Sequence, residues 1–197
     1  MKKLITLLAA CSALIAAHAG TATAGSTVSL NGTFFTDPGS WGAGTQAAPA
    51  DLVDGVYQPE GHQWNLDSIW WNGITQPTNS ITIALAGVYA ITDFSVQADD
   101  NDSYLLEYFG TDLAWHNAWA IDPVYSWGLI TRTTTLGAPI IASQLRFTAT
   151  GGDGYYAVSE IEANGRKISS VPETTSSMML LAGAFGMIGA LRRRFRS

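Results

Sequence analysis

The chain has 197 residues and a formal net charge of −6 at pH 7. Its two ends hold six of the 10 basic residues but only one of the 16 acidic residues, so the part between them has 4 basic and 15 acidic residues and a net charge of −11. A surface this acidic repels phosphate backbones, which argues against a nucleic-acid partner. The single cysteine, Cys11, lies in the N-terminal apolar segment, so no disulfide is expected in the domain that follows.

Residues 1–24 have the layout of a secretory signal peptide. Two lysines precede a run of apolar and small residues at 4–17. Small residues then offer cleavage after Ala19 or after Ala24. We therefore expect export, with residues 25–168 forming one domain outside the cell membrane.

In this domain the apolar residues recur with the period of β-strands. The candidate strands are 81–85, 94–97, 104–109, 145–148 and 155–161. Clusters of Gly, Asn, Asp and Pro lie between them, at 76–79, 99–102 and 151–154. No amphipathic helix is predicted between the two apolar ends. Short strands separated by turn residues predict an all-β sandwich.

The run Asp99-Asp100-Asn101-Asp102 has three interpretations. Asp and Asn favour turns, so the simplest is a turn between two strands. Oxygen-rich loops also bind calcium. Paired carboxylates can act as acid and base, but consecutive residues point in different directions, which disfavours catalysis. The domain also has no closely spaced histidine pair, nucleophile elbow or phosphate loop.

Seven tryptophans are many for a chain of this size; they stand at 41, 64, 70, 71, 115, 119 and 127. Trp64, Trp70, Trp71 and Trp119 lie near polar or glycine-rich segments, where flat aromatic faces could stack on sugar rings. Neighbouring residues of a strand point to opposite faces, so at least one ring of the Trp70-Trp71 pair is expected to face outward. These four are the candidate glycan-binding residues, and core packing is the alternative for each.

The C-terminal residues 169–197 contain a second apolar segment. Residues 176–191 carry no charge, and as a helix they span about 24 Å, against roughly 30 Å of hydrocarbon. The arginines that follow would stay in the cytoplasm by the positive-inside rule. The sequence therefore predicts a short transmembrane helix with a basic tail.

Val171-Pro172-Glu173, the apolar helix and the cluster Arg192-Arg193-Arg194 together resemble the PEP-CTERM sorting signal. The usual Pro-Glu-Pro reads Pro-Glu-Thr in this chain. The resemblance implies recognition by an exosortase, with membrane anchoring only in transit and release to the cell surface or the extracellular space. A plain tail anchor is the alternative.

The order of motifs across residues 30–165 also resembles a known family. Leu52-Val53-Asp54-Gly55 comes first, then Trp70-Trp71, residues 91–97 and 104–108, Leu145-Arg146-Phe147 and Val158-Ser159-Glu160-Ile161. This order is similar to the discoidin, or coagulation-factor C-type, branch of the galactose-binding-like domains. The resemblance implies a jelly-roll β-sandwich whose loops at one end bind glycans, lipid head groups or proteins, without catalysis.

The same resemblance implies a structural calcium ion held by Asp54 and Glu160, whose hard oxygen ligands suit calcium outside the cell. The alternative is that Asp54 caps a turn and Glu160 is a solvated strand residue.

The expected function is that of an exported, non-catalytic protein of the cell surface or extracellular matrix, which binds an exopolysaccharide or surface glycan. A structural envelope or biofilm protein without a defined small ligand is the alternative, and a hydrolase is the weakest of the three interpretations.

Overall fold

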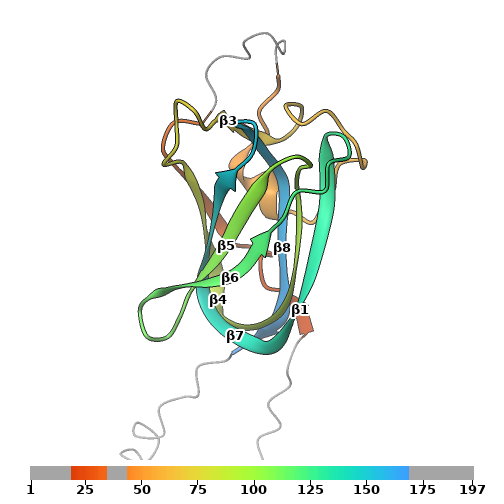
Figure 1. The fold of residues 1–197 in the computed structure, drawn as a ribbon. Coiled ribbons are helices and arrows are strands. Elements are labelled where there is room, and N and C mark those ends of the chain that lie inside the picture. The colour runs from red at the N-terminus through yellow and green to blue at the C-terminus, as the bar shows by residue number, and fades with distance from the viewer. Residues whose placement is uncertain (1–18, 35–43, 169–197) are drawn as a thin grey trace, which may run out of the picture. The chain divides into compact units, whose positions relative to one another are not determined.

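The computed structural model describes residues 19–34 and 44–168 (Figure 1). Its elements in chain order are β1 (Ala19–Thr21), β2 (Thr27–Asn31), the 3-10 helix η2 (Pro49–Val53), β3 (Ile69–Asn72), β4 (Ser80–Asp99), β5 (Ser103–Phe109), β6 (Trp115–Ile121), β7 (Leu129–Gly151) and β8 (Tyr155–Lys167). The predicted all-β class is confirmed, and every predicted strand lies within β4, β5, β7 or β8.

Parts of the chain with predicted targeting roles lie outside this description. Residues 1–18 of the expected signal peptide and the expected sorting signal at 169–197 are not among the described residues. Within the described part, no helix is long and apolar enough to cross a membrane.

Two long strands, β4 and β7, are shared by both layers of the sandwich. The first part of β4 pairs with β2 and with the end of β7, which continues through β5 to β6. After a register shift between Ala84 and Tyr89, the second part of β4 lies between the start of β7 and β8. Strand β8 also pairs with β1 and β3. The inner faces of the two layers form the core.

The alternation predicted from the sequence places the core residues. Ile81 and Ile83 are fully buried, whereas Thr82 between them is only partly buried. Phe94 and Val96 repeat the pattern from the second part of β4. Tyr104 of β5 stacks on Phe147 of β7, with ring centroids 4.8 Å apart. The period of two therefore identifies the inward faces correctly.

The fold begins before the predicted boundary at residue 25. Strand β1 pairs with the end of β8. The backbone N–H of Ala22 donates to the carbonyl of Ala163 at 2.6 Å, and both Ala22 and Thr23 are fully buried. Cleavage after Ala24 would remove these contacts, whereas cleavage after Ala19 would keep most of them.

Strand pairing brings three turns to the same end of the sandwich. Asp99, the last residue of β4, pairs with Leu129 at the start of β7. At the start of β5, Ser103 pairs with Gly151 at the end of β7. The next residue, Tyr104, pairs with Ile121 at the end of β6. The β4–β5, β6–β7 and β7–β8 connections, far apart in the sequence, therefore surround one small area.

Candidate functional site

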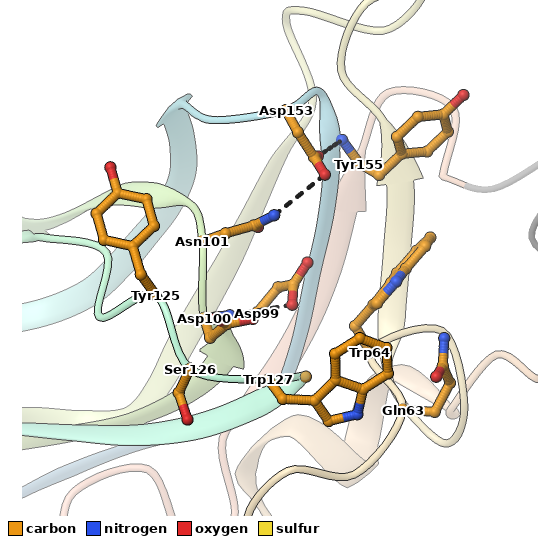
Figure 2. A pocket seen from close by; sticks show the side chains of 11 residues that line it. Gln63, Trp64, Asp99, Asp100, Asn101, Tyr125, Ser126, Trp127, Asp153 and Tyr155 are labelled. Carbon is orange, nitrogen blue, oxygen red and sulfur yellow. Dashed lines mark hydrogen bonds between the residues drawn. The ribbon is translucent and has the colours of Figure 1, made fainter.

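A cavity of about 310 Å³ opens where these three connections meet the segment that precedes β3 (Figure 2). Aromatic side chains form its walls and acidic side chains lie at its centre. Its lining consists of Gln63, Trp64, Asp99, Asp100, Asn101, Tyr125, Ser126, Trp127, Gly128, Asp153 and Tyr155. Flat apolar surfaces beside a few polar groups are the usual composition of a small-molecule site.

The most exposed aromatic rings of the cavity come from the β6–β7 connection. Tyr125 is 77% exposed and Trp127 is 65% exposed, although large apolar side chains are normally covered in a folded protein. Figure 2 shows the two rings on opposite sides of the acidic centre. Trp64 and Tyr155 continue the wall beyond Trp127, with their ring centroids 6.0 Å apart.

Backbone contacts hold this connection in place. The N–H groups of Val124 and Tyr125 donate to the carbonyl of Asp100, at 2.8 and 3.2 Å. Gly128 adopts a φ of 63°, and a Cβ atom there would lie 2.1 Å from the carbonyl oxygen of His62, so only glycine fits. The exposed rings are therefore mounted on a fixed loop.

The acidic centre belongs to the β4–β5 turn, which confirms the predicted turn at 99–102. Asp99 is 3% exposed and Asp100 is 7% exposed, yet both line the cavity. Burial first, and then the neighbouring carboxylate of Asp102, raise the pKa of Asp99 to about 8. Burial and the Asp153 carboxylate raise the pKa of Asp102 to about 7.

The basic residue beneath this turn supports its backbone. The Arg132 guanidinium donates to the carbonyl of Asp99 at 2.8 Å and to the carbonyls of Asp102 and Asp122, each at 3.3 Å. It also lies over the ring of Tyr104, 5.5 Å from the centroid. Arg132 therefore fixes the turn from below and does not line the cavity.

Among the predicted tryptophans, only Trp64 lines this cavity. The expectation that Trp70 or Trp71 faces outward is wrong, because both are 1% exposed. Strand β3 is covered on both faces. The Trp71 ring packs in the main core, with its centroid 5.2 Å from that of the Phe34 ring. The Trp70 ring packs against Trp64, and their ring centroids are 5.5 Å apart. Trp119 is half-buried on β6 and packs against the main core, away from the cavity lining.

Tyr125 and Trp127 were missed as candidates from the sequence. They belong to the segment Pro123-Val124-Tyr125-Ser126-Trp127-Gly128, in which aromatic residues alternate with turn-forming ones between two strands. Aromatic residues in a short loop have no inward face to occupy, and this feature is the signal that could have identified them.

The predicted calcium ligands lie close together, at a place distinct from the cavity. Glu160 of β8 is fully buried, and neither carboxylate oxygen makes a well-formed hydrogen bond within the described residues. Burial and the neighbouring Asp54 carboxylate raise the pKa of Glu160 to about 8. The alternative view of Glu160 as a solvated residue is wrong. Asp54 does form a turn, because its Oδ1 accepts the N–H of Val56 at 2.8 Å.

Two neighbouring carboxyl groups, one of them fully buried, fit a hard cation, which would supply the missing positive charge. In the ranges 19–34 and 44–168, however, no group of three or more His, Cys, Asp or Glu side chains is placed to hold a metal ion. A calcium ion at Asp54 and Glu160 would therefore need backbone carbonyls to complete its shell.

Comparisons with known proteins agree with this architecture. Neither a protein-family model nor a curated protein sequence matches the chain. Among solved structures, the family 32 carbohydrate-binding module of Clostridium perfringens NanJ, in complex with galactose, has a TM-score of 0.51 at 14% identity, over 75% of this chain and 99% of that one. The family 32 module of Streptococcus pneumoniae EndoD has a TM-score of 0.51 at 15% identity, over 73% and 98%.

A fucolectin from striped bass (Morone saxatilis) serum has a TM-score of 0.52 at 9% identity, over 75% of this chain and 49% of that one. At such low identity these similarities establish the fold alone. The chain has the same β-sandwich fold as these structures, which agrees with the jelly roll that the sequence resemblance implied.

Proposed function

We propose that this chain is an exported, non-catalytic protein that binds carbohydrate in the cavity between Tyr125 and Trp127. The observation that carries the proposal is two exposed aromatic rings on a fixed loop, on either side of buried polar groups. The fold supports it, because two of the similar structures are described as carbohydrate-binding modules and one as a lectin.

The chemistry of the cavity suits a sugar. The C–H face of a pyranose ring would stack on Trp127 or Tyr125, because flat aromatic surfaces supply contact area at little entropic cost. The carboxylates of Asp99 and Asp100 would accept hydrogen bonds from hydroxyl groups. A cavity of about 310 Å³ has room for the end of a glycan and not for a long segment of polymer.

Substitution of the exposed rings tests the proposal. Trp127→Ala and Tyr125→Ala should each weaken glycan retention by about tenfold or more, the effect of losing about 1.4 kcal/mol of stacking. Binding of the full-length chain to a glycan array, followed by calorimetry on the best ligand, measures this loss.

Leu113→Ala is the control, because Leu113 is 78% exposed but lies in the β5–β6 turn, at the other end of β5. If the wild-type chain retains no glycan, the alternative of a structural matrix protein takes over. Release of reducing sugar from a bound glycan would instead favour the hydrolase.

We propose further that Asp54 and Glu160 hold a structural calcium ion, which would neutralise two close carboxylates and tie the segment after η2 to β8. The fully buried carboxyl group of Glu160 next to the Asp54 carboxylate supports this assignment. When bound, the ion would supply charge neutralisation only, and the glycan cavity lies elsewhere.

For targeting, we propose that the chain is exported by its N-terminal segment and sorted by its C-terminal segment. The support is the sequence order of Pro172-Glu173, the apolar run and the arginine cluster. An exosortase would cut near Pro172, and the protein would leave the inner membrane for the surface.

Intact-mass measurement on envelope fractions tests this targeting. The expected mass lacks residues from about Pro172 onward, and the N-terminus that retains β1 is the one made by cleavage after Ala19. Recovery of only full-length, inner-membrane protein with Arg192, Arg193 and Arg194 attached would support a plain tail anchor.

A further inference from the structure

The charge of the cavity is one-sided. Asp99, Asp100 and Asp153 line it, and none of the described residues that line it is Lys, Arg or His. Arg132 is occupied by the backbone carbonyls beneath the turn. Carboxylates that converge without a cation repel one another. The pKa of Asp99 is raised by burial, then by the Asp102 carboxylate beneath the cavity, and less by the carboxylates of Asp100 and Asp153.

Two neighbouring polar side chains of the cavity have acceptor oxygens without a protein donor. Asp100 is 7% exposed, and its carboxylate makes no hydrogen bond among the described residues. Asn101 uses its Nδ2 to donate to Asp153 at 3.1 Å, which leaves its Oδ1 buried without a partner in the described structure. A buried acceptor such as Asn101 Oδ1 costs free energy unless a ligand supplies a donor.

A primary ammonium group matches this arrangement better than any neutral substituent of a sugar. It carries a positive charge and three donors, with no acceptor. It is also attracted to the faces of tryptophan and tyrosine, which Trp127 and Tyr125 present beside the carboxylates. An acetamido group has only one N–H donor and no charge, and its carbonyl oxygen adds another acceptor.

We propose that this cavity selects glycans with free amino groups, so that its ligand is a cationic hexosamine rather than the N-acetylated form of the same sugar. The inference rests on the proposed function and defines the substrate class of that site. The ammonium would lie against the Asp100 carboxylate, and the sugar ring would stack on an aromatic wall.

The test compares two oligosaccharides that differ only in this group. Calorimetry on the full-length chain at about pH 6, where an amine with a pKa of about 8 is protonated, would use tetramers of β-linked glucosamine and of N-acetylglucosamine. We expect the glucosamine tetramer to bind at least about tenfold more tightly, as a charge-assisted hydrogen bond is about twice as strong as a neutral one. Its advantage should shrink between about 0.01 M and about 1 M salt, as the screening length falls from about 30 Å to about 3 Å.

Asp100→Asn should remove most of this preference, because the amide keeps the shape of the side chain and loses its charge. Asp112→Asn makes the same change of net charge in the β5–β6 turn, and it should leave the preference intact. If Asp100→Asn leaves the preference intact as Asp112→Asn does, then Asp100 acts only through long-range attraction. This outcome would contradict the proposed contact between Asp100 and the ammonium.

The outcomes separate the two proposals. Equal binding of the tetramers, tighter binding of the acetylated one, or binding only to other glycans of an array would overturn the amino-sugar inference while the glycan function stands. Absence of binding to every glycan would overturn both.

Discussion

The buried carboxyl groups of Asp99 and Asp102 make the stability of the folded chain depend on pH. Their pKa values are raised to about 8 and about 7, chiefly by burial. In the unfolded chain an aspartate has a pKa of about 3.9. Between about pH 4 and about pH 8 the folded chain therefore binds more protons than the unfolded chain. The free energy of unfolding must then fall as the pH rises through this window.

We expect the melting temperature to decrease from about pH 5 to about pH 9. The free energy of unfolding should fall by up to about 1.4 kcal/mol per pH unit for each extra proton that the folded chain binds. Asp99→Asn should flatten this dependence in part, because the amide is neutral at every pH. Asp102 and Glu160, whose pKa values are also raised, account for the remainder. Thermal denaturation across this pH range measures both slopes.

Ser126→Ala provides the control, since it changes a cavity residue that does not titrate. Its slope should match that of the wild-type chain. Identical slopes for Asp99→Asn and wild type would show that the Asp99 carboxyl is not held protonated by its surroundings.

At the scale of strands, periodicity predicts the inward faces but not the lengths of the elements. The segments 81–85 and 94–97 were expected as separate strands, and the structure joins them in the continuous strand β4. The chain shifts register between Ala84 and Tyr89, where Gly87 has a φ of 142°. Such an irregularity lets one strand serve two layers. A glycine is equally typical of a turn between two strands. The sequence therefore could not predict that the two segments belong to one continuous strand.

The strand scale also explains which site residues the sequence revealed. Asp99 to Asp102 were recognised as a turn because Asp and Asn favour turns locally. That this turn meets the 123–128 loop depends on the pairing of Asp99 with Leu129 and of Tyr104 with Ile121, which are long-range contacts. Trp70 and Trp71 failed as candidates for a similar reason. Trp71 packs among core residues distant in sequence, and Trp70 is covered by the distant Leu129 and Ala157 as well as by the nearby Trp64.

At the scale of the whole molecule, the resemblance in motif order predicted the jelly roll and the proximity of Asp54 to Glu160. It succeeded because the order of strands determines which loops share an end. It did not identify the aromatic walls of the cavity, because loop residues vary without changing the fold. The fold was therefore predictable to a greater extent than the ligand chemistry.

The proposed calcium ion should stabilise the whole domain. An ionised Glu160 buried beside the Asp54 carboxylate destabilises the folded chain, and an ion bound only to that state raises its stability by mass action. For a dissociation constant of about 10⁻⁴–10⁻³ M, typical of extracellular modules, about 10 mM calcium should contribute about 1.4–2.7 kcal/mol to the free energy of unfolding.

The melting temperature of the full-length chain should rise with calcium and fall with chelator. Asp54→Ala should abolish the response, and Asp112→Ala should keep it. Glu160→Gln should also abolish it, and at about pH 9, above the raised pKa of Glu160, it should raise stability in chelator because it removes the buried charge. An identical melting curve for the wild-type chain in calcium and in chelator would contradict the site.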